Sequence, residues 1–317
     1  MADVVVVGAG ISGIACAREL RTAGHAVVVR DTGRRPGGRM ALRRHDGRVV
    51  DIGASYFTVS GPDFAEVVDD WSARGLARPW TDTFAVRSPE GRRTTTGPVR
   101  WAAPGGLRGL VADLATGLDV RQADPVRSVT PDGQRPRVDD HPHDAVVLAM
   151  PDPQARRLLR PGHPVHAALD DPYSPSMVLT ARWTRRTWAD VDGIFVNDHP
   201  DLVWVADDGL RRGDRAPVLV AHATADRASR HLTDPSEASG PLLAALREVV
   251  DVPDEDPDLV HVQRWTFARP VHGRPATHHL GDDRIGACGD SWGPSSSVET
   301  AWRSGRDLGR ALVERLS

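Results

Sequence analysis

Three closely spaced glycines near the start of the chain could bind a phosphate group. They follow an apolar run at residues 3–7 in the order Gly8-x-Gly10-x-x-Gly13, and a second apolar run ends shortly before Asp31. In a strand–turn–helix–strand unit, such glycines let the backbone approach a pyrophosphate, and the acid accepts hydrogen bonds from both ribose hydroxyls. The spacing therefore predicts a dinucleotide site at the edge of a parallel sheet.

A second glycine pair favours FAD as the tightly held dinucleotide. Residues 35–40 read Arg-Pro-Gly-Gly-Arg-Met and begin only a few residues after Asp31. The segment resembles the one that wraps the FAD pyrophosphate in amine-oxidase-like flavoproteins, although by itself it is equally an ordinary turn. Near the other end, Asp290 follows a short apolar strand, and a helix begins near Val298. The acid could bind a ribityl chain, or it could simply cap a turn; the helix start would stabilise an anionic reduced flavin ring.

The bulk composition excludes several classes of function. The 317 residues carry 40 basic and 43 acidic side chains, so neither nucleic acid nor an anionic membrane is expected as a partner. All the basic residues are arginines, which we attribute to compositional bias. The two cysteines and the absence of a leader or a long apolar segment predict a cytoplasmic protein with no membrane span. The 13 histidines form no metal-ligand pattern, so no metal is expected.

The order of predicted elements indicates an α/β fold with two domains. We expect a Rossmann-type FAD-binding domain formed by residues 1–55, 100–151 and 275–317. Alternating apolar residues in the rest of the chain are typical of half-exposed antiparallel strands. Residues 56–99 and 152–274 are therefore predicted to form an inserted, mostly antiparallel substrate domain.

The whole chain resembles the bacterial branch of the renalase family. The matching stretches run in family order and are residues 8–13, 36–40, 51–57, 101–107, 146–149 with Pro151, 264–265, 289–290, 298–299 and 301–302. The resemblance implies non-covalent FAD in a fold like that of p-hydroxybenzoate hydroxylase. It also implies hydride transfer from a 2- or 6-dihydro isomer of NAD(P), with O2 as electron acceptor and H2O2 as product. Residues 291–297 depart from the family pattern, which puts the exact substrate in doubt more than the cofactor.

Together the motifs and the resemblance give two sets of candidate site residues. The candidate FAD-binding residues are Gly8, Gly10, Ile11, Ser12, Gly13, Asp31, Thr32, Gly38, Arg39, Met40, Gly53, Ala54, Ser55, Val126, Gly289, Asp290, Val298, Glu299 and Ala301. The candidate substrate-pocket residues are Tyr56, Trp292, Trp204, His222, Trp265 and Trp302. Each pocket candidate is also a typical packing residue, and no catalytic side chain is assigned beyond the flavin itself.

Two other functions stay open at this stage. A flavin amine oxidase or desaturase in a biosynthetic pathway would use the same scaffold, because amine oxidation does not require a lysine. A non-catalytic nucleotide-binding protein would share only the glycine motifs, since a fold alone does not establish an activity.

Overall fold

A six-stranded sheet at one end of the molecule carries the glycine turn. The computed structural model describes residues 1–133, 135–252 and 255–317. The sheet has the strand order β17-β18-β11-β1-β2-β7, and all its pairs are parallel except β17–β18. Its strands are β1 (Asp3–Val7), β2 (Ala26–Asp31), β7 (Asp119–Gln122), β11 (Ala145–Leu148), β17 (His279–Leu280) and β18 (Ile285–Ala287). The central strands are continuous apolar runs because both faces of the sheet are covered.

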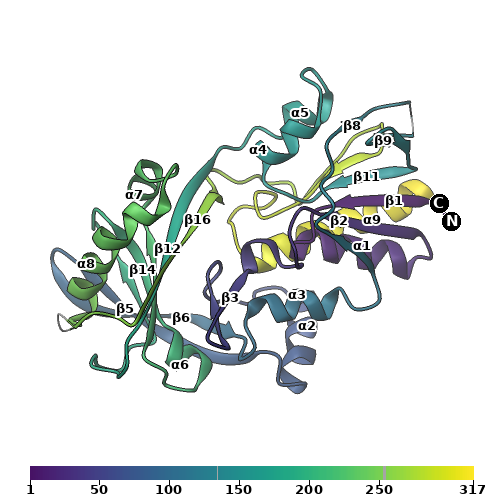
Figure 1. The fold of residues 1–317 in the computed structure, drawn as a ribbon. Coiled ribbons are helices and arrows are strands. Elements are labelled where there is room, and N and C mark those ends of the chain that lie inside the picture. Colours follow the sequence, from purple (N-terminus) through teal and green to yellow (C-terminus); the bar gives the residue numbers. More distant parts are fainter. Residues whose placement is uncertain (134, 253–254) are drawn as a thin grey trace.

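Helices cover one face of this sheet, and short elements cover the other (Figure 1). The first face carries α1 (Ile11–Thr22), α2 (Pro62–Ala73), α3 (Leu107–Leu114) and α9 (Val298–Leu316), whose apolar side chains share one core. Helices α1 and α9 pack so closely that a Cβ on Gly305 would lie 1.8 Å from the backbone oxygen of Ser12. The second face carries α4 (Asp152–Ala155), η2 (Arg156–Leu158), α5 (Pro164–Ala168), β8 (Val129–Thr130), β9 (Arg137–Val138) and β10 (His141–Pro142).

A seven-stranded sheet forms the second lobe, with the order β16-β12-β15-β14-β13-β5-β6. Among the described strands of this sheet, only β13 and β5 form a parallel pair. The strands are β5 (Arg78–Ser88), β6 (Gly91–Ala102), β12 (Tyr173–Arg182), β13 (Gly193–Val196), β14 (Leu202–Asp207), β15 (Val218–Ala223) and β16 (Leu259–Pro270). The helical elements of this lobe are α6 (Asp208–Arg212), α7 (Ala225–Arg230), η3 (Pro235–Ala238) and α8 (Ser239–Val250), and the apolar face of α8 packs on the sheet. This sheet agrees with the predicted mostly antiparallel insertion.

The packing differs from the predicted segment assignment at two places. Helix α2 lies within residues 56–99, yet Phe64, Val68 and Trp71 pack in the core of the first lobe. Residues 152–169 also pack there, against the second face of the parallel sheet. In both cases a short amphipathic helix is stabilised more by burying its apolar face on the core of the first lobe than by packing on the antiparallel sheet that its chain neighbours form.

A hairpin and a short 3₁₀ turn connect the glycine turn to the second lobe. The strands β3 (Leu42–His45) and β4 (Arg48–Asp51) are joined by Asp46 and Gly47, which both have positive φ. The predicted Asp-Gly turn is therefore present, and its mirror-image geometry matches the twist of the strands. The 3₁₀ turn η1 (Gly38–Met40) precedes the hairpin and returns the chain to the carboxyl end of the parallel sheet.

Candidate active site

A cleft of about 1710 Å³ lies where the parallel sheet, the hairpin and strand β16 meet. Most of the candidate FAD-binding residues line it, although they come from distant parts of the sequence. These are Gly8, Gly10, Ile11, Ser12, Asp31, Thr32, Gly38, Arg39, Met40, Gly53, Ala54, Ser55, Val126, Asp290, Val298 and Ala301. Gly13, Gly289 and Glu299 do not line it. The chain's opening and its last helix thus line the same cleft.

The glycines of the first motif have different roles in the structure. A Cβ on Gly10 would meet no protein atom within 4 Å, so glycine here keeps the cleft open beside the backbone. A Cβ on Gly13 would lie 2.0 Å from the backbone oxygen of Gly8, so this glycine allows helix α1 to pack on the turn. No side chain caps the start of α1. Its first amide groups are therefore free to bind an anion such as the FAD pyrophosphate.

Asp31 is fixed at the end of β2 by two backbone amides. Its Oδ2 accepts a hydrogen bond from Ala9 N at 2.6 Å, and its Oδ1 accepts one from Gly33 N at 2.5 Å. The carboxylate has further lone pairs and lines the cleft. This arrangement suits the predicted contact with ribose hydroxyls, because the acid is held in one orientation beside the glycine turn.

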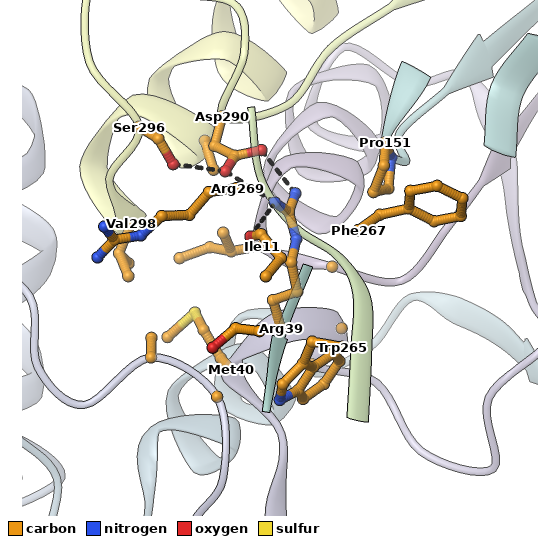
Figure 2. A pocket seen from close by; sticks show the side chains of 18 of the residues that line it. Ile11, Arg39, Met40, Pro151, Trp265, Phe267, Arg269, Asp290, Ser296 and Val298 are labelled. Atoms are coloured by element: carbon orange, nitrogen blue, oxygen red, sulfur yellow. Dashed lines mark hydrogen bonds and ion pairs between the residues drawn. The ribbon is translucent and has the colours of Figure 1, made fainter. Parts of the chain in front are cut away.

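An ion pair joins the second glycine segment to the carboxy-terminal part of the cleft (Figure 2). Arg39 donates to both carboxylate oxygens of Asp290, at 2.8 and 2.6 Å, and also to the backbone oxygen of Ala268 at 3.1 Å. The Ser296 hydroxyl donates to Asp290 at 2.6 Å. The sequence placed Arg39 and Asp290 separately against the cofactor, and their pairing was not predicted. Asp290 therefore holds the two walls together as well as facing the cleft.

The start of helix α9 faces the cleft, but three residues near it do not. Glu299 accepts hydrogen bonds from Ser60 N and Gly61 N, both at 2.7 Å, and so anchors that loop to the helix. Gly289 donates its amide to the Ser304 hydroxyl at 2.9 Å inside the protein. Trp302 packs against Phe64, with ring centroids 5.2 Å apart. These residues shape the wall from behind.

Trp292 was predicted to line the substrate pocket and instead lies in the core. It is 5% exposed and packs beneath the parallel sheet, with the Arg274 guanidinium 4.4 Å from its ring centroid. The turn after β18 directs the indole toward this apolar cluster, where burying a large ring is favourable. The polar part of the same loop, at Ser296, faces the cleft instead.

The other pocket candidates meet at the second lobe's side of the cleft. Tyr56 lies in an aromatic cluster with Trp204 and Phe84, at centroid distances of 5.6 and 5.4 Å. Trp265 donates its indole N–H to the backbone oxygen of Ile52 at 2.6 Å, and it lies beside Met40 and Arg39 in Figure 2. All four of these candidates line the cleft, namely Tyr56, Trp204, His222 and Trp265.

Local electrostatics fix the protonation of the polar groups in this wall. Burial lowers the pKa of His222 to about 3, helped by the charges of Arg269 and Arg211, so the imidazole is neutral at neutral pH. Burial raises the pKa of Tyr56, and the nearby Arg100 and Arg269 offset this only in part. Both side chains are therefore uncharged hydrogen-bonding groups.

The lining of the cleft is strongly basic among the residues that the structure describes. It contains nine arginines and two carboxylates, namely Arg30, Arg34, Arg35, Arg39, Arg100, Arg108, Arg157, Arg264 and Arg269 against Asp31 and Asp290. Both carboxylates are already hydrogen-bonded, as described above. Arg269 has no carboxylate within ion-pair distance among residues 1–133, 135–252 and 255–317. Apart from Arg39, the sequence did not single out these arginines as site residues, because the abundance of arginine hides them.

The described part of the chain contains no group of three or more side chains able to hold a metal ion. Nor does it contain a helix that is long and apolar enough to cross a membrane.

Relatives with known names resemble short parts of the sequence. Putrescine oxidase from Kocuria rosea is 33% identical over 93 residues, which are 29% of this chain and 20% of that protein. Protoporphyrinogen oxidase 2 from Arabidopsis thaliana is 37% identical over 71 residues, 22% of this chain and 14% of that protein. The matched regions thus span a fifth or less of these relatives.

Solved structures resemble the whole fold. Cyclohexylamine oxidase from Brevibacterium oxydans IH-35A superposes with a TM-score of 0.79 at 15% identity, covering 99% of both chains. A putrescine oxidase bound to putrescine gives a TM-score of 0.74 at 18% identity and the same coverage. At these identities the likeness shows the shared fold.

Two family models divide the chain between them. The model of NAD(P)-binding Rossmann-like domains matches residues 6–71, and that of flavin-containing amine oxidoreductases matches residues 76–312. The second match covers most of the chain and confirms the predicted FAD cofactor. The chain therefore belongs to the family of flavin-containing amine oxidoreductases.

Proposed function

We propose that this flavoprotein oxidises a reduced nicotinamide dinucleotide, a 2- or 6-dihydro isomer of NAD(P), and passes the electrons to O2 to give H2O2. The resemblance to renalases suggests this substrate and a fold like that of p-hydroxybenzoate hydroxylase. The observation that carries the proposal is the basic lining at the second lobe's side of the cleft, where strands β6 and β16 contribute Arg100, Arg264 and Arg269 and no described carboxylate of that lobe lines the cleft. Such a lining attracts an anionic dinucleotide and repels a substrate that keeps a cationic ammonium group.

The residues of the chain would divide the work of binding and orientation. When bound, FAD supplies the redox chemistry by accepting a hydride from the substrate carbon. The glycine turn and the start of α1 would hold its pyrophosphate, and Asp31 its ribose. The Arg39–Asp290 pair would keep the two walls at a fixed distance around it. Tyr56 and Trp204 would bind the substrate ring through their faces and exclude water.

Few titratable groups are needed for this reaction. Loss of a hydride from a dihydropyridine restores the aromatic ring, so no proton leaves the same carbon and no strong base is required. The neutral His222 and the protonated Tyr56 fit this requirement. Arg100 and Arg269 would bind the phosphates or carboxamide of the substrate at the second lobe's side of the cleft.

Amine oxidation is the second candidate, because the family and the aromatic wall of Tyr56, Trp204 and Phe195 suit a neutral amine. Anaerobic stopped-flow mixing separates the two. We expect 2- or 6-dihydro-NAD(P) to bleach the flavin absorbance within seconds, while putrescine, cyclohexylamine and benzylamine do not. Rapid bleaching by an amine alone would reject the proposal. A colourless protein that cannot be reconstituted with FAD would favour a non-catalytic nucleotide-binding role.

A further inference from the structure

A hydrogen-bonded group of three side chains stands in the second lobe's wall of the cleft. Trp204 and His222 are direct partners across the antiparallel strands β14 and β15 and so lie on the same face of the sheet. The Ser55 hydroxyl, from the loop after β4, reaches both. It lies 3.0 Å from the indole nitrogen of Trp204 and 3.3 Å from Nε2 of His222.

The loop that carries Ser55 is itself held in place. Arg211, which is 1% exposed, donates a hydrogen bond to the backbone oxygen of Ser55 at 2.9 Å. The same guanidinium donates to the buried carboxylate of Asp208 at 2.5 Å. Because the arginine is fixed by a buried ion pair, the backbone that carries the Ser55 hydroxyl is held by the fold rather than by a ligand.

The donors and acceptors in this group favour one tautomer of His222. An indole N–H can only donate, so the Ser55 oxygen accepts from Trp204. The hydroxyl proton then needs an acceptor, and among the described residues the recorded one is Nε2 of His222. With Nε2 as the acceptor of the Ser55 hydroxyl proton, Nε2 carries a lone pair, and in the neutral ring the proton resides on Nδ1. The low pKa of His222 agrees with a ring that stays neutral.

The protonated nitrogen is open to the cleft. His222 lines the cleft, and among the described residues its ring has a recorded hydrogen-bond contact at Nε2 and none at Nδ1. Nδ1 is also not among the fully buried polar atoms without a partner, so a ligand or solvent can reach it. The site is thus a fixed neutral donor without a protein partner.

We propose that His222 is a specificity-determining residue, which donates its Nδ1–H to a carbonyl oxygen of the substrate. The identity of that oxygen rests on the proposed function, in which it is the carboxamide oxygen of the dihydronicotinamide ring. An N–H donor offers no acceptor to an ammonium group, so the residue selects a carbonyl-bearing heterocycle over a protonated amine. Ser55 and Arg211 act through His222 as positioning residues.

The tautomer can be measured without any substrate. In ¹⁵N-histidine-labelled holoprotein at pH 7, long-range ¹H–¹⁵N correlation should show His222 with a protonated Nδ1 and an unprotonated Nε2. The signal is assigned by its absence from His222→Asn. Ser55→Ala should remove this preference, because the hydroxyl donor is lost. A protonated Nε2 or an imidazolium at pH 7 would overturn the proposal.

Binding of small non-reacting ligands tests the contact itself. Nicotinamide carries the carbonyl oxygen and 3-methylpyridine lacks it, and both can be titrated through the perturbation of the flavin spectrum. We expect wild-type protein to prefer nicotinamide by about tenfold or more, as for a site built around one hydrogen bond. His222→Leu should bind both ligands equally, and His222→Asn, which keeps an N–H near the Nδ1 position, should recover most of the preference.

An exposed histidine outside the cleft provides the matched control for the His222 variants. His272→Phe replaces a histidine whose side chain is 70% exposed and which does not line the cleft, so it should behave as wild type. If His222→Leu keeps the full preference while retaining FAD, His222 is not the donor. If the protein shows the tautomer and the preference but is not reduced by dihydronicotinamides, this inference stands and the proposed substrate is rejected.

Discussion

The Asp290 carboxylate connects the two walls of the cleft through its ion pair with Arg39. Its side chain is 10% exposed and accepts two hydrogen bonds from Arg39, so neutralising it leaves a partly buried guanidinium without its counter-charge. We expect Asp290→Asn to lower the free energy of unfolding by about 3 kcal/mol, the lower end for breaking a buried ion pair. The FAD content after gel filtration should fall as well. Chemical denaturation and the ratio of flavin to protein absorbance measure the two effects.

The matched control is an acid in exposed ion pairs. Asp251 pairs with Arg87 and Arg92, but its side chain is 56% exposed, so Asp251→Asn should cost no more than about 0.5 kcal/mol. Equal stability and FAD content for both variants would show that the Arg39–Asp290 pair does not connect the walls.

The low pKa of His222 predicts an acid-dependent loss of stability. The folded ring titrates near 3, whereas the unfolded ring titrates near 6.5, so only the unfolded state gains a proton between these values. The contribution is constant above pH 6.5 and is lost as the pH falls from 6.5 toward 3, by up to roughly 1.4 kcal/mol per pH unit. In His222→Asn this loss is absent. Denaturation curves between pH 7 and pH 5 should therefore be less pH-dependent for the variant, and parallel curves would contradict the assignment.

The glycine turn and helix α1 show how one motif serves two purposes. Gly10 has an extended backbone that alanine can adopt, and its Cβ would enter the open cleft. Gly10→Ala should therefore fold with a stability change within about 1 kcal/mol but bind FAD poorly. Gly13→Ala should instead destabilise the protein by roughly 3 kcal/mol, because its Cβ would overlap the Gly8 oxygen. Thermal unfolding of the apoproteins and FAD titration of each variant distinguish the two; a Gly10→Ala protein with full FAD affinity would refute the phosphate role.

Strand pairing also placed residues that the sequence named only singly. The mostly apolar runs at residues 202–206 and 218–223 indicate two strands, but not that Trp204 lies opposite His222. The register shift between Leu202 and Trp204 decides this, because one extra residue changes which side chains face the cleft. A local pattern does not reveal such a bulge.

At the scale of the whole molecule, the cleft and the rest of the protein differ in charge. The chain has a net charge of −3, yet the lining of the cleft is rich in arginine. We expect the Kd of an anionic dinucleotide to rise roughly threefold to tenfold between about 50 and 300 mM NaCl, because salt screens exposed charges. Arg269→Gln should reduce this dependence. Stopped-flow titration at several salt concentrations measures it, with a neutral pyridine ligand as the insensitive control; no salt dependence would argue against an anionic substrate.

The sequence by itself determined the FAD cofactor and the α/β class of the fold, and it predicted where the dinucleotide binds. The reason is that these features depend on local signals: glycine spacing, an acid at a strand end and the change from continuous to alternating apolar runs. Asp31, Arg39 and Asp290 were named from such signals, and the structure brings them to one cleft.

Only the tertiary structure decided which side chains face that cleft and what they do there. Trp292 lies in the core because burial of its indole is more favourable than exposure in the cleft, although it follows the Gly289-Asp290 motif directly. The Glu299 carboxylate points away from the cleft and accepts hydrogen bonds from the amides of Ser60 and Gly61. The arginine lining, the Arg39–Asp290 pair and the tautomer of His222 arise from contacts between residues far apart in the chain. Such contacts are fixed by packing and strand register, and no local spacing encodes them.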